Sequence, residues 1–312
     1  MSLRIAVIGL GHMGKIHLNK LTTLEDIEIS SIADVDTVCT KEISHNTGIK
    51  TCENYHDAIR SCDGAVISSP TETHYDIGKA FLDAGKHVFI EKPITVKPDD
   101  ARELIDIAEK RNLVFQVGHL ERFNPVFLKA SRSVQKPVMI EATRISPFTG
   151  RSTDVDVVLD LMIHDLDLVL SLVNEEISGL SAQGVCFMTD KLDAAGVRIE
   201  FADGCTANIT ASRISPKKER ALSIYENDKS LSVDLLQGKY VGIVRNHDGK
   251  INISEYTAPK IDPVQDELKE FISSIKGEKT PTVTGADGLK ALVLAVRIKE
   301  YIAKKQRVST IQ

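Results

Sequence analysis

Short apolar runs alternate with helical patterns from residue 3 to about residue 118. Five runs rich in Ile and Val predict strands at Arg4–Ile8, Glu28–Ala33, Ala65–Ser69, His87–Ile90 and Val114–Val117. They are nearly unbroken in apolar character, as expected for parallel strands that are buried on both faces. The alternation of strands and helices therefore predicts a doubly wound α/β domain with a parallel sheet.

The pattern changes after about residue 120. Apolar and polar residues now alternate, as in 197–201 and 207–211, and Asp203-Gly204 between these two segments is a hairpin-turn signal. Asp248-Gly249 predicts another turn. We expect a mostly antiparallel open sheet with one face in solvent or at an interface.

Two helices are predicted after this sheet. One begins with Asp262 as N-cap and Pro263 at its first position, and the other runs from about Asp287 to Lys305. We expect both to cover the antiparallel sheet. The predicted organisation is a doubly wound domain at residues 1–120, followed by an α+β domain at residues 121–312.

Composition narrows the class of protein. The chain of 312 residues is long enough for two domains, and its net charge of −5 argues against nucleic acid as a partner. The apolar run Ala291–Val296 is far shorter than the roughly 20 residues of a membrane span, so no membrane partner is expected. Five cysteines without a C-x-x-C pair predict reduced packing thiols of a cytoplasmic protein and no metal site.

A G-x-G-x-x-G motif follows the first predicted strand and opens a helix. It comprises Gly9, Gly11 and Gly14, with His12 and Met13 inside it. The first glycine permits a tight turn, the second lets the backbone approach a pyrophosphate, and the third lets the helix pack on the strand. The phosphates of a dinucleotide would then lie on the N–H groups at the helix N-terminus.

The second predicted strand ends at Asp34, twenty residues beyond Gly14. A carboxylate there accepts hydrogen bonds from the adenosine ribose and repels a 2′-phosphate, and no arginine follows closely. The motif and the aspartate together predict a Rossmann domain that binds NAD in preference to NADP. A methyltransferase using S-adenosylmethionine could have a similar glycine loop, but the later motifs favour hydride transfer.

Two further segments leave the carboxyl ends of predicted strands, where ligands of open parallel sheets bind. They contribute the candidate cofactor-binding residues Ser69, Pro70, Thr71, His74, Glu91 and Lys92. Lys92 precedes a proline that restricts its backbone, and the Lys92–Pro93 bond is a candidate for the cis form. Without further context, an ordinary exposed lysine is the more common interpretation of Lys92.

An apolar helix predicted over Val155–Val173 contains Asp160, His164, Asp165 and Asp167. Asp160 and His164 are four residues apart, so they share a face at roughly 6 Å along the axis, and Asp167 continues that face. Polar side chains in so apolar a run need partners or a function. A hydrogen-bonded, half-buried histidine is the alternative interpretation.

These segments together resemble the glucose-fructose oxidoreductase, inositol dehydrogenase and rhizopine-catabolism (Gfo/Idh/MocA) family over nearly the whole chain. The resemblance rests on the glycine motif, Pro70–His74, Gly85–Pro93 and Asp160-x-x-x-His164. It implies oxidation of a secondary alcohol of a sugar or cyclitol with NAD. His164 would be the general base, Asp160 would orient the imidazole or the substrate, and Lys92 would stabilise alkoxide charge.

A narrower resemblance links residues 118–125 and 157–172 to the branch that oxidises C3 of UDP-N-acetylglucosamine. The pyrophosphate of such a nucleotide sugar needs cationic partners. The candidate substrate-binding residues are Arg122, Asn124, Arg144, Arg151 and Arg213, with Lys217 and Lys218 in addition. Each arginine taken alone is also compatible with an ordinary surface residue.

Two other functions stay open at this point. One is a non-catalytic NAD-binding regulator, and the other is a glycosidase that uses NAD transiently. The presence of Lys92, Asp160 and His164 favours a dehydrogenase. The family also implies a homo-oligomer, a dimer or tetramer, joined through the open face of the second sheet.

Overall fold

The computed structural model describes residues 2–150, 155–259 and 262–309, which form two compact units. The first unit combines Met1–Leu120 with Asp262–Leu289, and the second combines Glu121–Ile261 with Lys290–Gln312. The division at residue 120 coincides with the predicted boundary. The return of Asp262–Leu289 to the first unit differs from the prediction of two consecutive domains.

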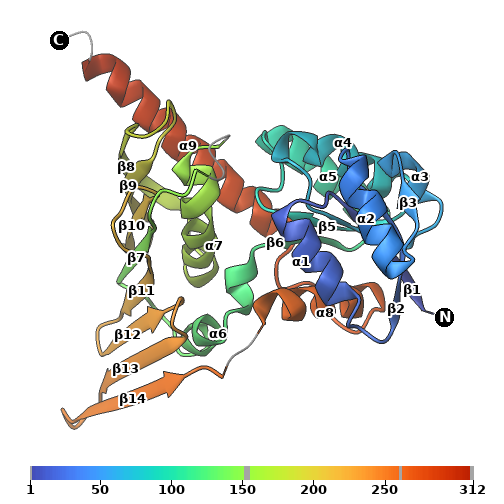
Figure 1. The fold of residues 1–312 in the computed structure, drawn as a ribbon. Coiled ribbons are helices and arrows are strands. Elements are labelled where there is room, and N and C mark those ends of the chain that lie inside the picture. Colours follow the sequence, from blue (N-terminus) through green and yellow to red (C-terminus); the bar gives the residue numbers. More distant parts are fainter. Residues whose placement is uncertain (1, 151–154, 260–261, 310–312) are drawn as a thin grey trace. The chain divides into compact units, whose positions relative to one another are not determined.

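The first unit contains a six-stranded parallel sheet of order β3-β2-β1-β4-β5-β6, so the predicted α/β class is confirmed (Figure 1). The strands are β1 Leu3–Ile8, β2 Ile27–Ala33, β3 Thr51–Cys52, β4 Gly64–Ile67, β5 His87–Glu91 and β6 Phe115–Gly118. All five predicted strands are present. Strand β3 was not predicted because two residues are too few to give a recognisable pattern.

Helices cover both faces of this sheet. They are α1 His12–Leu21, α2 Thr37–Thr47, α3 Tyr55–Ile59, α4 His74–Asp83, α5 Pro98–Lys110 and α8 Pro263–Ile275, with the short turn η1 Thr71–Thr73. Successive residues of a strand point to opposite faces, so Phe89 and Ile90 of β5 separate the two layers. Phe89 packs in a core with residues of α1 and α8, whereas Ile90 lies against Gly78 of α4.

The expectation that helix α8 covers the antiparallel sheet is wrong. Its residues Leu268, Phe271 and Ile272 belong to the core of the first unit, where they pack with residues of β1 and α1. The predicted cap itself is present, since Asp262 accepts a hydrogen bond from Gln265 N–H. The apolar spacing of an amphipathic helix indicates that one face is buried but not which sheet buries it.

The second unit contains an eight-stranded sheet of order β14-β13-β12-β11-β7-β10-β9-β8. Its strands are β7 Met139–Ile145, β8 Ile177–Val185, β9 Ala194–Phe201, β10 Thr206–Ser212, β11 Glu219–Tyr225, β12 Lys229–Asp234, β13 Lys239–Arg245 and β14 Ile251–Thr257. Only the β7–β10 pair is parallel, so the predicted mostly antiparallel sheet is confirmed. Gly204 and Gly249 adopt positive φ in the two predicted turns.

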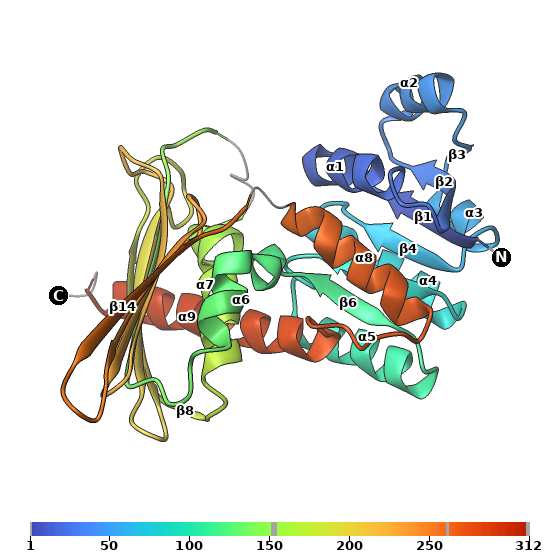
Figure 2. The ribbon, with the colours of Figure 1, turned by 90° about the horizontal axis from the view of Figure 1, so that it is seen from below.

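One face of this sheet is covered by helical residues, as Figure 2 shows for α7. The helical segments are η2 Leu120–Phe123, α6 Pro125–Ser131, η3 Val158–Met162, α7 Ile163–Leu172 and α9 Gly285–Ser309. The helix predicted over Val155–Val173 differs from a regular α-helix, because η3 is a π-helical turn. Within the described residues, no helix contains an apolar stretch long enough to cross a membrane.

We expect Phe271→Ala to destabilise the first unit selectively. The ring is fully buried, so its removal leaves a cavity that costs about 3–5 kcal/mol. Hydrogen exchange followed by mass spectrometry should be faster in peptides of β1 and β5 and unchanged in β9 and β10. Ile253→Ala, at an exposed position of β14, is the matched control. Faster exchange in β9 and β10 alone would contradict the assignment of α8.

Candidate active site

The three glycines of the motif occupy different steric environments between β1 and α1. Gly9 has φ +86°, and a Cβ there would lie 2.5 Å from the backbone N of Ser69. A Cβ on Gly14 would lie 1.9 Å from the carbonyl oxygen of Gly9, so only glycine lets the helix approach the strand. A Cβ on Gly11 would meet no atom within 4 Å. Gly11 therefore leaves open space beside the first turn of the helix, which fits a dinucleotide phosphate.

Asp34 follows β2 and ties the end of that strand to the glycine turn. Its carboxylate accepts hydrogen bonds from Leu10 N–H and from Asp36 N–H, the latter at 2.8 Å. Val35 beside it is 99% exposed. The carboxylate is thus held at the carboxyl edge of the parallel sheet, next to the N-terminus of α1.

His74 lies beneath the loop that contains Ser69, Pro70 and Thr71. Its Nε2 lies 2.8 Å from the carbonyl oxygen of Ser69, and its Nδ1 lies 2.9 Å from that of Pro93. Burial lowers the pKa of the ring, although both carbonyl contacts partly oppose this shift. His74 thus connects the segment after β4 to the segment after β5. Its buried ring holds the predicted cofactor loop through the contact with the carbonyl oxygen of Ser69.

Lys92 directly follows β5, and the Lys92–Pro93 bond is cis. The backbone N–H of Lys92 donates to Glu91 Oε2 at 3.1 Å. On its C-terminal side, the carbonyl oxygen of Pro93 contacts His74. The backbone that carries Lys92 is therefore fixed on both sides by buried side chains of the first unit.

The second predicted cluster lies in the second unit, on η3 and α7. Asp160 and His164 are half-buried, whereas Asp165 and Asp167 are each 1% exposed. Asp156 fixes the start of this segment by accepting hydrogen bonds from two backbone N–H groups and by pairing with Lys299. The π-helical turn places a local irregularity just before His164, and such turns occur frequently at functional sites.

Asp165 is part of a buried ion-pair network. Arg144 of β7 donates two hydrogen bonds to Asp165, at 2.8 and 2.9 Å, and one to Glu121 at 2.9 Å. Arg220 also donates to Glu121, at 3.1 Å. Burial opposes ionisation of Glu121, but the charges of the two arginines outweigh it and lower its pKa. The network attaches α7 to the sheet of the second unit.

The other predicted substrate-binding residues also have partners inside the second unit. Arg122 makes a bidentate pair with Asp167 at 2.7 and 3.0 Å, and Asn124 caps α6 through Val126 N–H. Arg213 pairs with Asp193, which is fully buried. Arg144 and Arg213 are therefore engaged with carboxylates of the second unit, and substrate binding by these two residues stays a prediction. Arg151 lies outside the described residues.

Burial raises the pKa of Asp193, but three backbone N–H groups, Thr189 and Arg213 outweigh that effect and lower it. Sequence reasoning missed Asp193 and Glu121, because their arginine partners lie at least 20 residues away and no local pattern marks such pairs. It also missed His17 and Glu267, which join Glu91 in the one group of three metal-ligand side chains among the described residues. The spacing of His17 from Gly14 gave no signal of that contact.

Comparison with known proteins assigns both units to one family. Residues 3–119 match the oxidoreductase family with an NAD-binding Rossmann fold, and residues 127–232 match the Gfo/Idh/MocA C-terminal domain. The chain is 30% identical to the UDP-N-acetylglucosamine 3-dehydrogenase of Acidithiobacillus ferrooxidans, covering 95% of this chain and 96% of that protein. A solved structure of that enzyme superposes with a TM-score of 0.91, covering 97% of this chain and 98% of the other.

A myo-inositol 2-dehydrogenase of Thermotoga maritima is 27% identical, covering 98% of each chain. The scyllo-inositol dehydrogenase of Lactobacillus casei, solved with NAD(H) and scyllo-inositol, shares the fold with a TM-score of 0.84 at 23% identity, covering 98% of each chain. The N-terminal domain is an NAD-binding Rossmann domain, and the relatives act on hydroxyl groups of sugars or inositols. The chain belongs to the Gfo/Idh/MocA family of NAD-dependent oxidoreductases.

Proposed function

We propose that this protein oxidises a secondary hydroxyl, at C3, of a nucleotide sugar such as UDP-N-acetylglucosamine. The observation that carries the proposal is the 30% identity to a UDP-N-acetylglucosamine 3-dehydrogenase along 95% of the chain. Lys92, Asp160 and His164, which the family resemblance implies as catalytic, are all present. NAD, when bound, supplies the nicotinamide that accepts the hydride.

The proposed cofactor site uses the glycine turn and the carboxyl edge of the parallel sheet. The N–H groups of His12 and Met13 at the start of α1 would bind the pyrophosphate in the space left by Gly11. Asp34 would accept hydrogen bonds from the ribose hydroxyls. The proposal also includes the segments that follow β4 and β5, with Ser69, Pro70, Thr71, Glu91 and Lys92.

In the proposed reaction, His164 takes the proton of the substrate hydroxyl while the hydride leaves the carbon that carries this hydroxyl. The half-buried position of His164 on α7 suits a base that must reach substrate. Asp160 would orient the imidazole or the sugar. Lys92 would stabilise the negative charge that grows on the hydroxyl oxygen, and its fixed backbone supports such a role.

The ion pairs of the second unit bear on which cations could bind the pyrophosphate of the substrate. Arg144 and Arg213 are 3% and 4% exposed and paired with carboxylates, so we leave both out of the proposed substrate site. Arg122 is also paired, with Asp167, but it is only half-buried, so it stays in the proposed site together with Asn124 and Arg151. Lys217 and Lys218, which are exposed on the loop between β10 and β11, are the additional cations.

Oxidation of a free cyclitol is the second candidate function. It is favoured by the 27% identity to a myo-inositol 2-dehydrogenase and by the internal pairing of the two arginines. A cytoplasmic location stays a prediction, and so does a homo-oligomer joined through the sheet face on which Arg198 and Asn208 lie.

Alanine at Gly11 and at Gly14 should separate cofactor binding from folding. Gly14→Ala forces a Cβ into the Gly9 carbonyl, so we expect Tm to fall by roughly 2–10 °C. Gly11→Ala meets no protein atom and should leave Tm unchanged, while the Kd for NAD rises about tenfold or more. Thermal melts and NAD titrations measure both effects. Normal NAD affinity in the folded Gly11→Ala protein would contradict the pyrophosphate site.

His164→Ala should lower kcat by roughly 10²–10⁴, because a positioned base contributes about that factor. The Kd for NAD should stay the same, since His164 lies in the second unit. Steady-state kinetics and an NAD titration test both expectations. His247→Ala, an exposed histidine of the same unit, is the matched control. Turnover within a few-fold of the parent would exclude His164 as the base.

A substrate panel should distinguish the two candidate functions. We expect NADH formation at 340 nm with UDP-N-acetylglucosamine, and none with glucose or myo-inositol. Because a 3-keto sugar accumulates poorly, the assay includes a coupled aminotransferase with glutamate. Faster turnover of myo-inositol than of any nucleotide sugar would establish the second function. Hydrolysis of a p-nitrophenyl glycoside without net NADH would support a glycosidase instead.

A further inference from the structure

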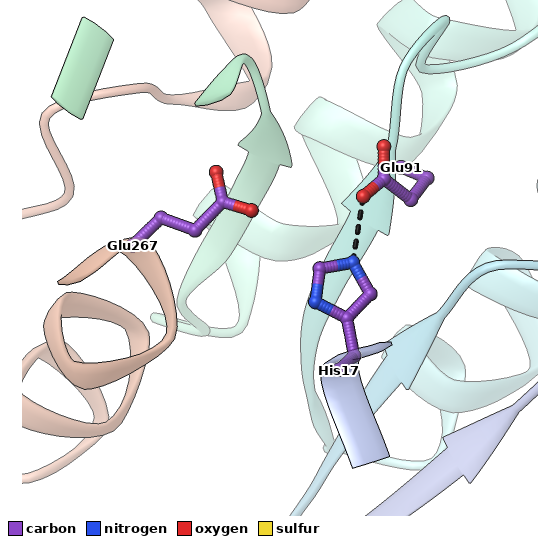
Figure 3. A group of neighbouring side chains, drawn as sticks. All are labelled: His17, Glu91 and Glu267. Atoms are coloured by element: carbon purple, nitrogen blue, oxygen red, sulfur yellow. Dashed lines mark hydrogen bonds and ion pairs between the residues drawn. The ribbon is translucent and has the colours of Figure 1, made fainter. Parts of the chain in front are cut away.

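Three buried ionisable side chains meet inside the first unit, away from the glycine turn (Figure 3). His17 comes from α1, Glu91 from the end of β5 and Glu267 from α8. Their exposed fractions are 0%, 8% and 0%. His17 Nε2 lies 2.6 Å from Glu91 Oε1, and one oxygen of each carboxylate lies within 4.8 Å of the other ligand atoms.

The surroundings of this cluster are apolar. The ring of His17 packs edge-on against Phe89 at 5.3 Å between centroids, and Phe89 packs against Phe271 at 5.9 Å. Among the described residues, neither carboxyl oxygen of Glu267 has a hydrogen-bond partner. In Figure 3 the carboxyl group of Glu267 points toward Glu91 and His17. An ionised carboxylate without a partner in such a site is strongly disfavoured.

The charges of the cluster do not balance if both carboxyl groups are ionised. Inside the cluster two negative charges would face at most one positive charge, that of His17, while the charge of Lys92, outside the cluster, acts on Glu91. Burial opposes ionisation of Glu91, but His17 and Lys92 outweigh it and lower the pKa of Glu91. For Glu267, burial and the charges of Glu91 and Glu270 all raise the pKa well above its usual value. The nearby amide of Gln116 is neutral and donates to the backbone carbonyl of Glu267.

We propose that Glu267 is held in its protonated form, and that the contact between His17 and Glu91 then positions Lys92 for the reaction. Glu91 uses its two oxygens for these two tasks. Oε1 contacts His17, and Oε2 accepts the backbone N–H of Lys92. A neutral Glu267 leaves this arrangement intact, whereas an ionised Glu267 would repel Glu91. The inference rests on the proposed role of Lys92.

The neighbouring strand is shaped to accommodate Glu91. Gly118 of β6 pairs with Glu91 in register. A Cβ on Gly118 would lie 3.1 Å from both the Cδ and the Oε2 of Glu91. A larger residue at 118 would therefore press on the oxygen that accepts the Lys92 N–H.

A divalent cation is the alternative to the proton, because an imidazole and two carboxylates are suitable metal ligands. The 2.6 Å contact between His17 and Glu91 leaves no room for an ion between those two atoms. A proton therefore satisfies the cluster without rearrangement, and a cation would have to separate the pair. The two alternatives predict opposite changes in the stability of Glu267→Gln relative to wild type as pH rises. A bound proton predicts a gain in relative stability, and a bound cation predicts a loss.

The pH dependence of stability tests the protonated state without any substrate. Because the pKa of Glu267 is raised on folding, the folded protein binds an extra proton above pH ~4.3, the usual pKa of glutamic acid. Wild-type stability should therefore fall relative to Glu267→Gln as pH rises above that value. The ratio of the two folding constants should change by up to tenfold, about 1.4 kcal/mol, per pH unit.

Urea unfolding of the full chain, followed by far-UV circular dichroism from pH 4.5 to pH 8 because the chain contains no tryptophan, gives this ratio. The comparison of two proteins cancels the other titrating groups. Asp266→Asn, which also removes a carboxylate from α8 but is not among the charges that raise the pKa of Glu267, is the matched control. A constant ratio of the two folding constants overturns the proposal. So does a Glu267→Gln protein that becomes less stable relative to wild type as pH rises. A fall in the wild-type Tm on addition of EDTA, with one equivalent of metal released, also overturns it.

The positioning role is tested on His17. His17→Ala should lower kcat by roughly 10–10², because a small displacement of a catalytic group costs about that factor, while the Kd for NAD stays within about threefold. His17→Gln, which keeps an N–H donor, should restore part of kcat. Loss of stability without a change in kcat would reduce His17 to a structural residue. An inactive parent protein would refute the proposed function, but it would leave the pH-dependent unfolding result unaffected.

Discussion

The close approach of α1 to β1 is the constraint on which the first unit depends. Gly14 has no Cβ, and any larger residue there would overlap the carbonyl of Gly9. The helix can therefore lie directly on the sheet, with Leu18 and Leu21 in the core. The same approach carries His17, three residues later, across to Glu91 at the end of β5. A single missing side chain thus shapes the glycine turn and the buried cluster together.

Buried ion pairs play the corresponding part in the second unit. Arg144 joins α7 to β7 through Asp165, and Arg122 reaches the same helix through Asp167. Such pairs add little net stability compared with apolar packing, because desolvation of the charges is costly. They do fix which way the helix faces, since each guanidinium has one arrangement that satisfies its carboxylate. The half-buried Asp160 and His164 are thereby presented from a helix with a defined rotation.

Elements could be predicted from the sequence where a continuous local run is buried. Packing partners could not be predicted where residues far apart in the sequence determine them. The parallel strands and the glycine motif were readable because their patterns are local. The destination of α8 was not, since its apolar face fits either sheet. Nothing in the spacing of Arg144 showed that Asp165 and Glu121 would neutralise it. The π-helical turn before His164 was equally unreadable, because it adds a backbone irregularity without a residue signature.

The discontinuity of the first unit has a consequence for synthesis on the ribosome. Residues 1–120 emerge first, yet the helix that covers Phe89 lies beyond residue 262. Until that helix is made, the face of the parallel sheet that carries Phe89 lacks the apolar residues of α8, and His17 and Glu91 lack Glu267 as a neighbour. The second unit is nearly complete by then, since its sheet ends at Thr257. The dinucleotide-binding unit is therefore completed only after the sheet of the second unit has been synthesised, and the NAD-binding half of the enzyme matures after that sheet.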